Sequence, residues 1–149
     1  MKHRISTSIL IKAPKQIVWD ILTDFQNYQN WNPFIKSASG EPILGQKLKV
    51  HIQPPGGSGM SFRPEIVELQ KEKELAWLGR LGFPGIFDGR HEFKLEEAED
   101  GETLFIHSEN FSGILVPFMK KGLDKKAKKG FENMNTVLKS LAEKQFIKA

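Results

Sequence analysis

The last third of the chain carries the pattern that most constrains its fold. From Leu115 onward the apolar residues follow one another at steps of three or four: Leu115, Met119, Leu123, Ala127, Phe131, Met134, Leu138 and Leu141. This spacing places them on one stripe of a helix that reaches about Gln145 and is roughly 45 Å long at 1.5 Å per residue. A helix of this length cannot bury its stripe alone, so the preceding residues must supply the surface that covers it.

The residues before this helix are mostly patterned as strands. Ile5, Thr7, Ile9 and Ile11 share one face of a first strand, and two short helices are predicted over 14–24 and 25–30. Further strands are predicted over 34–39, 47–53, 60–70, 74–81, 87–97 and 103–111, between Gly- and Pro-containing turns. We therefore predict a single α+β domain over residues 1–149, in which a curved antiparallel sheet of about seven strands wraps around the long C-terminal helix.

The composition limits the classes of function. With 39% hydrophobic and 27% charged residues, the 149-residue chain resembles an ordinary soluble globular protein. It has no cysteine, which excludes disulfides, thiolate nucleophiles and thiolate-bound zinc. We expect a cytoplasmic protein, because the polar N-terminal residues lack a signal-peptide core and no apolar run approaches the ~18 residues of a membrane span. Phosphate-binding loops, nucleophile elbows and dinucleotide fingerprints are also missing from the sequence.

The net charge of +4 is unevenly distributed. One short stretch with Asp124 as its single acid contains six lysines: Lys120, Lys121, Lys125, Lys126, Lys128 and Lys129. A solvated face of the long helix explains them, and the alternative is transient contact with an anionic membrane surface or an acidic partner protein. Nucleic acid is not expected as a partner, because no aromatic residues interleave with these lysines to stack on bases.

Strand parity identifies a first candidate for a buried polar group. In the strand over 87–97, His91 and Phe93 share one face, whereas the opposite face carries only charged residues: Arg90, Glu92, Lys94 and Glu96. We expect the charged face to contact solvent and His91 to point into the interior.

Several segments together resemble the START/SRPBCC superfamily, whose helix-grip fold is shared with birch-pollen-allergen-like proteins and polyketide cyclases. They are the opening strand, the terminal helix, and residues 14–19, 28–34, 75–77, 89–93 and 103–113. The similarity is in particular to the bacterial branch described as SRPBCC domain-containing or polyketide cyclase/dehydrase-like. It implies a cavity between sheet and helix for a lipid-, polyketide- or sterol-like molecule. Because some members are cyclases or aromatases and others are carriers, it leaves catalysis open.

The last strand ends in a Glu-x-Phe-x-Gly pattern. The same resemblance implies that the face of this strand with His107 and Glu109 points inward. His91, His107 and Glu109 would then project into one apolar chamber, where polar groups must pair with each other, with water or with a ligand. A Glu–His pair of this kind suits general acid–base catalysis of polyketide cyclisation. The alternative is a hydrogen-bonded pair that orients the ligand or holds the strands. Two histidines and a carboxylate also match a metal triad by type, but nothing fixes His91 against the others, and we expect neither metal nor cofactor.

Apolar side chains on the inward faces are candidates for the ligand-binding wall, with plain core packing as the alternative for each. They are Trp77, Phe62, Ile66, Phe87, Phe93, Phe105, Phe111, Phe118, Met119, Leu123, Phe131 and Met134. The apolar loop over 81–87 is a candidate lid. We predict a protein that binds or carries an apolar small molecule. The alternatives are a cyclase- or dehydratase-type enzyme that uses His91, His107 and Glu109, and a module that binds a partner or membrane through its basic helix.

Overall fold

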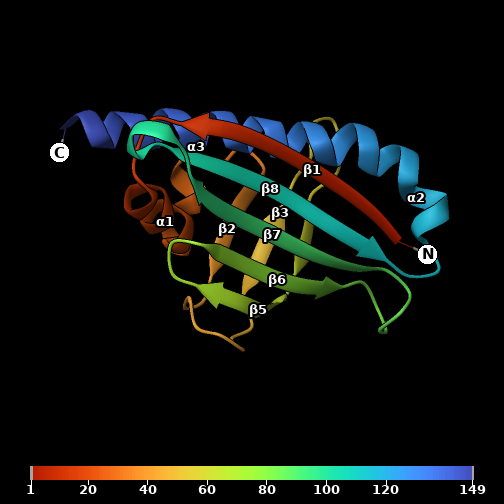
Figure 1. The fold of residues 1–149 in the computed structure, drawn as a ribbon. Coiled ribbons are helices and arrows are strands. Elements are labelled where there is room, and N and C mark those ends of the chain that lie inside the picture. The colour runs from red at the N-terminus through yellow and green to blue at the C-terminus, as the bar shows by residue number, and fades with distance from the viewer. Residues whose placement is uncertain (1, 149) are drawn as a thin grey trace.

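A computed structural model describes residues 2–148 and has the predicted α+β architecture (Figure 1). Its elements in chain order are β1 (Lys2–Ile11), α1 (Lys15–Thr23), η1 (Phe25–Asn30), β2 (Ile35–Ser39), β3 (Lys49–Ile52), β4 (Met60–Phe62), β5 (Glu65–Gln70), β6 (Glu74–Arg80), β7 (Asp88–Glu97), η2 (Glu99–Gly101), β8 (Thr103–Ser112), α2 (Val116–Gly122), η3 (Leu123–Ala127) and α3 (Lys128–Lys148). None of the helices within this range combines the length and the apolar composition that a membrane span requires.

The strands of residues 2–148 form two antiparallel sheets, one ordered β1-β8-β7-β6-β5 and the other β2-β3-β4. The run predicted as one strand over 60–70 is divided between them at Pro64, which has no N–H to donate to a strand partner. The described residues therefore contain eight strands instead of about seven. Backbone hydrogen bonds from Leu48 to Pro64 and from Ile66 to Gln46, at 2.8 and 2.9 Å, join the two sheets at this point.

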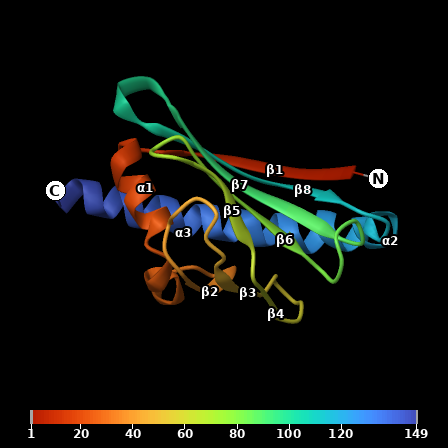
Figure 2. The same cartoon turned by 90° about the horizontal axis from the view of Figure 1, so that it is seen from below.

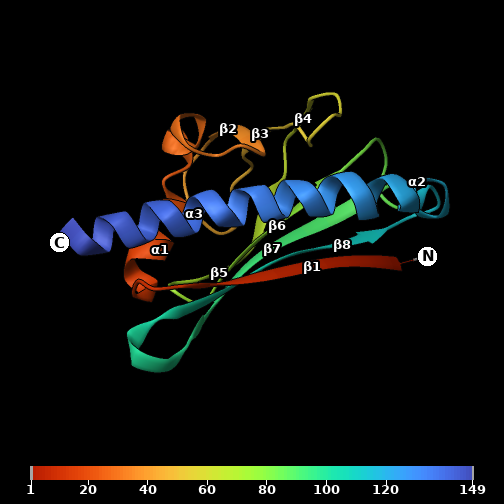
Figure 3. The same ribbon diagram turned by 90° about the horizontal axis from the view of Figure 1, so that it is seen from above.

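The long C-terminal helix lies across the curved sheet as predicted. Figure 2 shows α3 running behind the strands with α1 beside its C-terminal half, and Figure 3 shows it from the opposite side. In both views β2, β3 and β4 lie on one side of the helix and β1 on the other. The helix is therefore held between the two sheets.

The apolar stripe of this helix explains why η3 is a π-helical turn. Four steps of four residues, from Leu115 to Phe131, would rotate the stripe by about 160° around a regular α-helix. A π-helical turn takes up an additional residue and moves the later side chains back toward the sheet. As a result Leu123 and Ala127 face one end of the interior while Phe131 and Met134 face its centre.

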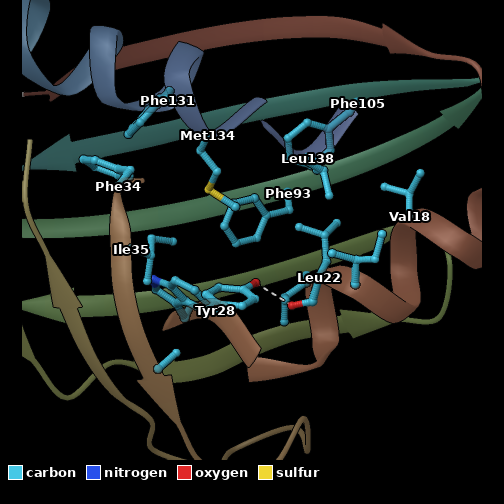
Figure 4. Packing of buried hydrophobic residues seen from close by; sticks show 14 of the residues in the cluster. Val18, Leu22, Tyr28, Phe34, Ile35, Phe93, Phe105, Phe131, Met134 and Leu138 are labelled. Carbon is cyan, nitrogen blue, oxygen red and sulfur yellow. Dashed lines mark hydrogen bonds between the residues drawn. The ribbon is translucent and has the colours of Figure 1, made fainter. Parts of the chain in front are cut away.

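The centre of the space between sheet and helix is filled with side chains (Figure 4). Phe93 and Phe105 from the sheet meet Phe131, Met134 and Leu138 from α3, and all five are fully buried. The residue pattern predicts a ligand chamber in much of this space. Large aromatic rings pack it instead, which confines any cavity to one end of the helix.

The core also contains a polar group that is fully satisfied. The buried Tyr28 hydroxyl donates a hydrogen bond to the Leu22 carbonyl, drawn as a dashed line in Figure 4. Burial, with a further contribution from the charge of Asp24, raises the pKa of Tyr28 well above its ordinary value. The hydroxyl therefore remains protonated, and it anchors η1 to the end of α1.

One charged residue departs from the predicted solvent face of β7. Glu92 is only 6% exposed, because its carboxylate accepts hydrogen bonds from Arg4 at 3.2 Å and Arg90 at 3.0 Å, and Asn110 donates a third. The expectation that this face is entirely solvated was wrong at Glu92. Neighbouring strands β1 and β8 supply the partners that allow a carboxylate to be buried there.

Candidate functional site

A cavity of about 160 Å³ lies at the α2 end of the interior. Its walls come from β3 and β4, the facing ends of β6, β7 and β8, and the helical segment over α2 and η3. For comparison, an apolar protein cavity of about 150 Å³ accommodates a benzene molecule. The cavity volume therefore fits a single ring or a short chain.

Half of the predicted wall residues lie in the lining of this cavity. They are Trp77, Phe62, Phe87, Phe111, Met119 and Leu123, together with His91 and Glu109. Five others, Ile66, Phe93, Phe105, Phe131 and Met134, are fully buried in the core outside the lining. Phe118 is 85% exposed and points into solvent, because it lies about 100° around the helix from Met119.

Sequence reasoning missed other lining residues. Val50 and Ile52 alternate in β3, and this alternation is a signal that could have identified them. Gly79 and Gly89 had no such signal: they face each other across β6 and β7 and line the cavity as a pair. The remaining missed residues are Phe34, Pro54, Met60, Pro64, Arg80, Leu81 and Ala127.

His91 and Glu109 form the polar corner of the cavity. They are direct partners in the β7–β8 register, and Nδ1 of His91 lies 3.1 Å from Oε1 of Glu109. The His91 side chain is 1% exposed and that of Glu109 is 17% exposed. A Cβ atom at Gly89 would overlap Oε2 of Glu109, so the glycine leaves the space that the carboxylate occupies. Trp77 covers His91 on the β6 side, with ring centroids 5.5 Å apart.

His107 lies behind His91 rather than in the cavity wall. Its Nε2 is 2.6 Å from Nε2 of His91, and its Nδ1 is 2.8 Å from Oδ1 of Asn135 in α3. Phe131 stacks on the ring at a centroid distance of 4.2 Å. Complete burial lowers the pKa of His107 well below its ordinary value, and electrostatic repulsion from His91 lowers it further, against the smaller opposing effect of the hydrogen bond with Asn135. The neutral ring is therefore favoured.

Asn135 and Thr7 complete the hydrogen bonding around His107. Asn135 donates through Nδ2 to Thr7 Oγ1 at 2.8 Å, and the Thr7 hydroxyl donates to the His107 carbonyl at 3.0 Å. Neither residue stands out in the sequence by its type alone. Asn135 lies four residues after Phe131 and three before Leu138, and a polar residue at this spacing on the apolar stripe is the signal that could have identified it.

The nitrogen atoms of the two histidines are directed at each other and at Glu109 and Asn135. Within residues 2–148, no group of three or more His, Asp or Glu side chains gathers in an arrangement that could hold a metal ion. The contacts among His91, His107, Glu109 and Asn135 offer hydrogen bonding and proton transfer next to the cavity.

Comparison with known proteins identifies the protein family and solved structures with a similar fold. Residues 2–143 match the family model described as polyketide cyclase / dehydrase and lipid transport. No curated protein matches the sequence significantly. A START superfamily protein from Mycobacterium smegmatis aligns with 21% identity and a TM-score of 0.72, over 96% of this chain and 99% of its own. The Zhui aromatase/cyclase from Streptomyces sp. R1128 aligns with 14% identity and a TM-score of 0.75, over 97% of this chain and 96% of its own. At these identities the likeness establishes the fold.

A curved sheet that packs on a long C-terminal helix is the fold that this chain shares with these two structures. Since the family model covers nearly the whole sequence, the chain belongs to the polyketide cyclase/dehydrase and lipid transport family.

Proposed function

We propose that the protein binds an apolar small molecule that carries one polar oxygen group. The observation that supports this proposal most directly is an apolar cavity interrupted on its inner wall by the His91–Glu109 pair. Such a cavity buries an apolar body without penalty, and a few placed polar groups select its orientation. Besides His91 and Glu109, the lining contains the charged side chain of Arg80. Arg80 is exposed, and its Nε lies 3.7 Å from Oδ1 of Asp88.

The cavity size restricts the ligand. At about 160 Å³ it accommodates a single-ring compound, and a lipid or a fused-ring polyketide requires the surrounding loops to move. Met60, Met119 and the 81–87 loop, which provides Leu81 and Phe87, are among the parts of the wall that also reach the surface. Met119 is suited to this because its flexible side chain adapts to different ligand shapes.

Two measurements test this proposal. Denaturing extraction of the purified protein followed by mass spectrometry should release an apolar compound in stoichiometric amount. Calorimetric titration with 4-ethylphenol should show binding that is at least tenfold tighter than that of ethylbenzene, since only the phenol can hydrogen-bond to Glu109. Protein that is always empty and binds neither probe would refute the proposal.

We propose cyclase- or dehydratase-type catalysis as a second function, because Glu109 is a carboxylate at the wall of the cavity with an imidazole at 3.1 Å. The carboxylate would accept the proton from the carbon next to one ketone, the enolate carbon would bond to the carbonyl carbon of a second ketone, and the alkoxide formed there would take the proton back from Glu109. Glu109→Gln and His91→Ala should abolish turnover of a short β-polyketide while 4-ethylphenol still binds to Glu109→Gln. Unchanged rates in both variants would exclude this chemistry.

We also propose that the end of the molecule near the cavity contacts an anionic membrane during ligand exchange. Phe83, Ile114 and Phe118 are 78%, 69% and 85% exposed. Backbone hydrogen bonds of 3.1 Å, from Ile114 to Gly85 and from Leu115 to Ile86, hold the loop with Phe83 against the start of α2. The six exposed lysines of the sequence follow on α2, η3 and α3. Apolar tips surrounded by lysines are typical of surfaces that bind anionic lipid headgroups.

Vesicle sedimentation tests this contact. Vesicles that contain phosphatidylserine should bind the protein at low salt and release it as salt increases, while phosphatidylcholine vesicles should not bind it. Phe118→Ser should weaken binding, and Ile147→Ser is the matched control because Ile147 is 82% exposed at the opposite end of the helix. Binding that is independent of salt, or equal loss in both variants, would contradict the assignment.

A further inference from the structure

We infer that Thr7, Asn135 and His107 form a hydrogen-bond chain of fixed direction, which determines where His91 carries its protons. His107 is then a positioning residue, and the His91–Glu109 pair at the cavity wall shares one proton. The direction of the chain follows from hydrogen bonds within the protein itself. Its consequence for the ligand rests on the proposed binding function.

The chain begins at the backbone carbonyl of His107, which can only accept a hydrogen bond. Thr7 Oγ1, 3.0 Å away, must therefore donate its single proton to this carbonyl. The Thr7 oxygen can then only accept from Asn135, so the amide nitrogen Nδ2 faces it at 2.8 Å. This orientation turns Oδ1 of Asn135 toward His107.

The amide oxygen of Asn135 determines the tautomer of His107. Because Oδ1 accepts, Nδ1 of His107 must carry the proton across the 2.8 Å contact. The ring is fully buried between Phe131 and Phe93, with centroid distances of 4.2 and 4.9 Å, and such surroundings favour its neutral form. A neutral ring with a proton on Nδ1 has a lone pair on Nε2, so His107 accepts the 2.6 Å hydrogen bond from Nε2 of His91.

Because of this direction, the contact between His91 and Glu109 can hold only one proton. Nε2 of His91 already donates its proton to His107, so only Nδ1 can exchange a proton with Oε1 of Glu109. A hydrogen bond across this 3.1 Å contact requires one proton between the two atoms, so the hydrogen-bonded pair is either imidazolium with carboxylate or imidazole with carboxylic acid and is neutral overall in both forms. The other rings that pack on His91 are those of Trp77, Phe93 and Phe131, which do not titrate.

A neutral pair of this kind matches a neutral ligand. With the proton on His91, the carboxylate of Glu109 accepts a hydrogen bond from a hydroxyl or enol. With the proton on Oε2 of Glu109 instead, the carboxylic acid donates to a ketone oxygen, and this bond replaces the one with His91. A carboxylate or an amine on the ligand would instead place an unbalanced charge in a largely apolar cavity. The structure thus assigns the polar group of the ligand to the ketone, enol or phenol class.

Nitrogen-15 NMR of histidine-labelled, ligand-free protein tests the chain directly. Each of the four imidazoles is assigned from its own His→Gln variant. In the wild type we expect His107 to be protonated on Nδ1 and unprotonated on Nε2, and His91 to be protonated on Nε2. His107 protonated on Nε2 would overturn the inference.

Asn135→Asp should reverse the chain. A carboxylate next to Nδ1 favours a charged His107, which then donates from Nε2, so the Nε2 resonance of His91 should move from the protonated to the unprotonated range. Asn133→Asp adds the same charge two residues away on α3, where Asn133 is partly exposed, and should leave the resonance unchanged. A spectrum of Asn135→Asp identical to that of the wild type would contradict the inference.

A second pair of variants decides the question if Asn135→Asp does not fold. Thr7→Val removes the acceptor that orients the amide of Asn135, so His107 should shift toward the tautomer protonated on Nε2. Thr7→Ser retains the hydroxyl and should restore the wild-type spectrum. Identical spectra for Thr7→Val and the wild type would refute the chain. Because these experiments use ligand-free protein, they can fail while 4-ethylphenol binds, and binding can fail while the tautomers are as expected.

Discussion

Replacing Gly89 with alanine should displace the Glu109 carboxylate without disturbing the sheet. A Cβ atom at this position would overlap Oε2 of Glu109, so the carboxylate must turn away and its 3.1 Å hydrogen bond with His91 must break. A hydrogen bond to a charged group contributes about 1.5–3 kcal/mol. We therefore expect 4-ethylphenol to bind roughly 10- to 150-fold more weakly, at about 1.4 kcal/mol per factor of ten.

Gly79→Ala is the matched control for this prediction. Gly79 is the cross-strand partner of Gly89 and also lines the cavity, but its added methyl group would meet only Pro64, at 3.8 Å. Calorimetric titration of both variants with 4-ethylphenol and ethylbenzene distinguishes a loss of cavity volume from displacement of Glu109. A loss of cavity volume weakens both probes in both variants, whereas displacement of Glu109 weakens the phenol in Gly89→Ala alone. Equal losses for the two probes would refute the role of Glu109.

Two further predictions concern the fold. An added methyl group at Gly130 would overlap the ring of Phe34, so Gly130→Ala should lower the free energy of unfolding by about 1–3 kcal/mol. Gly122→Ala, which meets nothing within 4 Å, should raise it by up to about 1 kcal/mol; urea denaturation measures both, and a stabilised Gly130→Ala would contradict the packing. The pKa of His107 is lowered in the folded state, so below the ordinary value of 6.5 the unfolded chain binds a proton that the folded protein does not. Stability should be complete above this pH and decrease below it by up to about 1.4 kcal/mol per unit. His107→Gln should remove this contribution to the pH dependence of the free energy of unfolding between pH 7 and 5, while His51→Gln should retain it. An unchanged pH dependence in His107→Gln would show that His107 is not the group responsible.

The sequence was sufficient to predict most of the secondary structure and most of the inward-facing residues, although it misplaced Phe118 and Glu92. Ile5, Thr7 and Ile11 alternate along β1 and are buried on one face, and the stripe from Leu115 to Leu141 predicted the long helix. These are local properties, because the period of an element appears in a few consecutive residues. One proline made the local prediction wrong: Pro64 divides a run predicted as one strand into two strands of different sheets.

Contacts between elements were decided only in the tertiary structure. The apolar pattern did not distinguish Phe131, which fills the core, from Leu123, which lines the cavity, since both lie on the same stripe. The register of β7 against β8 pairs His91 with Glu109, and the position of α3 brings Asn135 to His107. These relations depend on distances between residues far apart in the chain. Periodicity within one element contains no information about such distances, whereas sheet pairing and helix packing determine them.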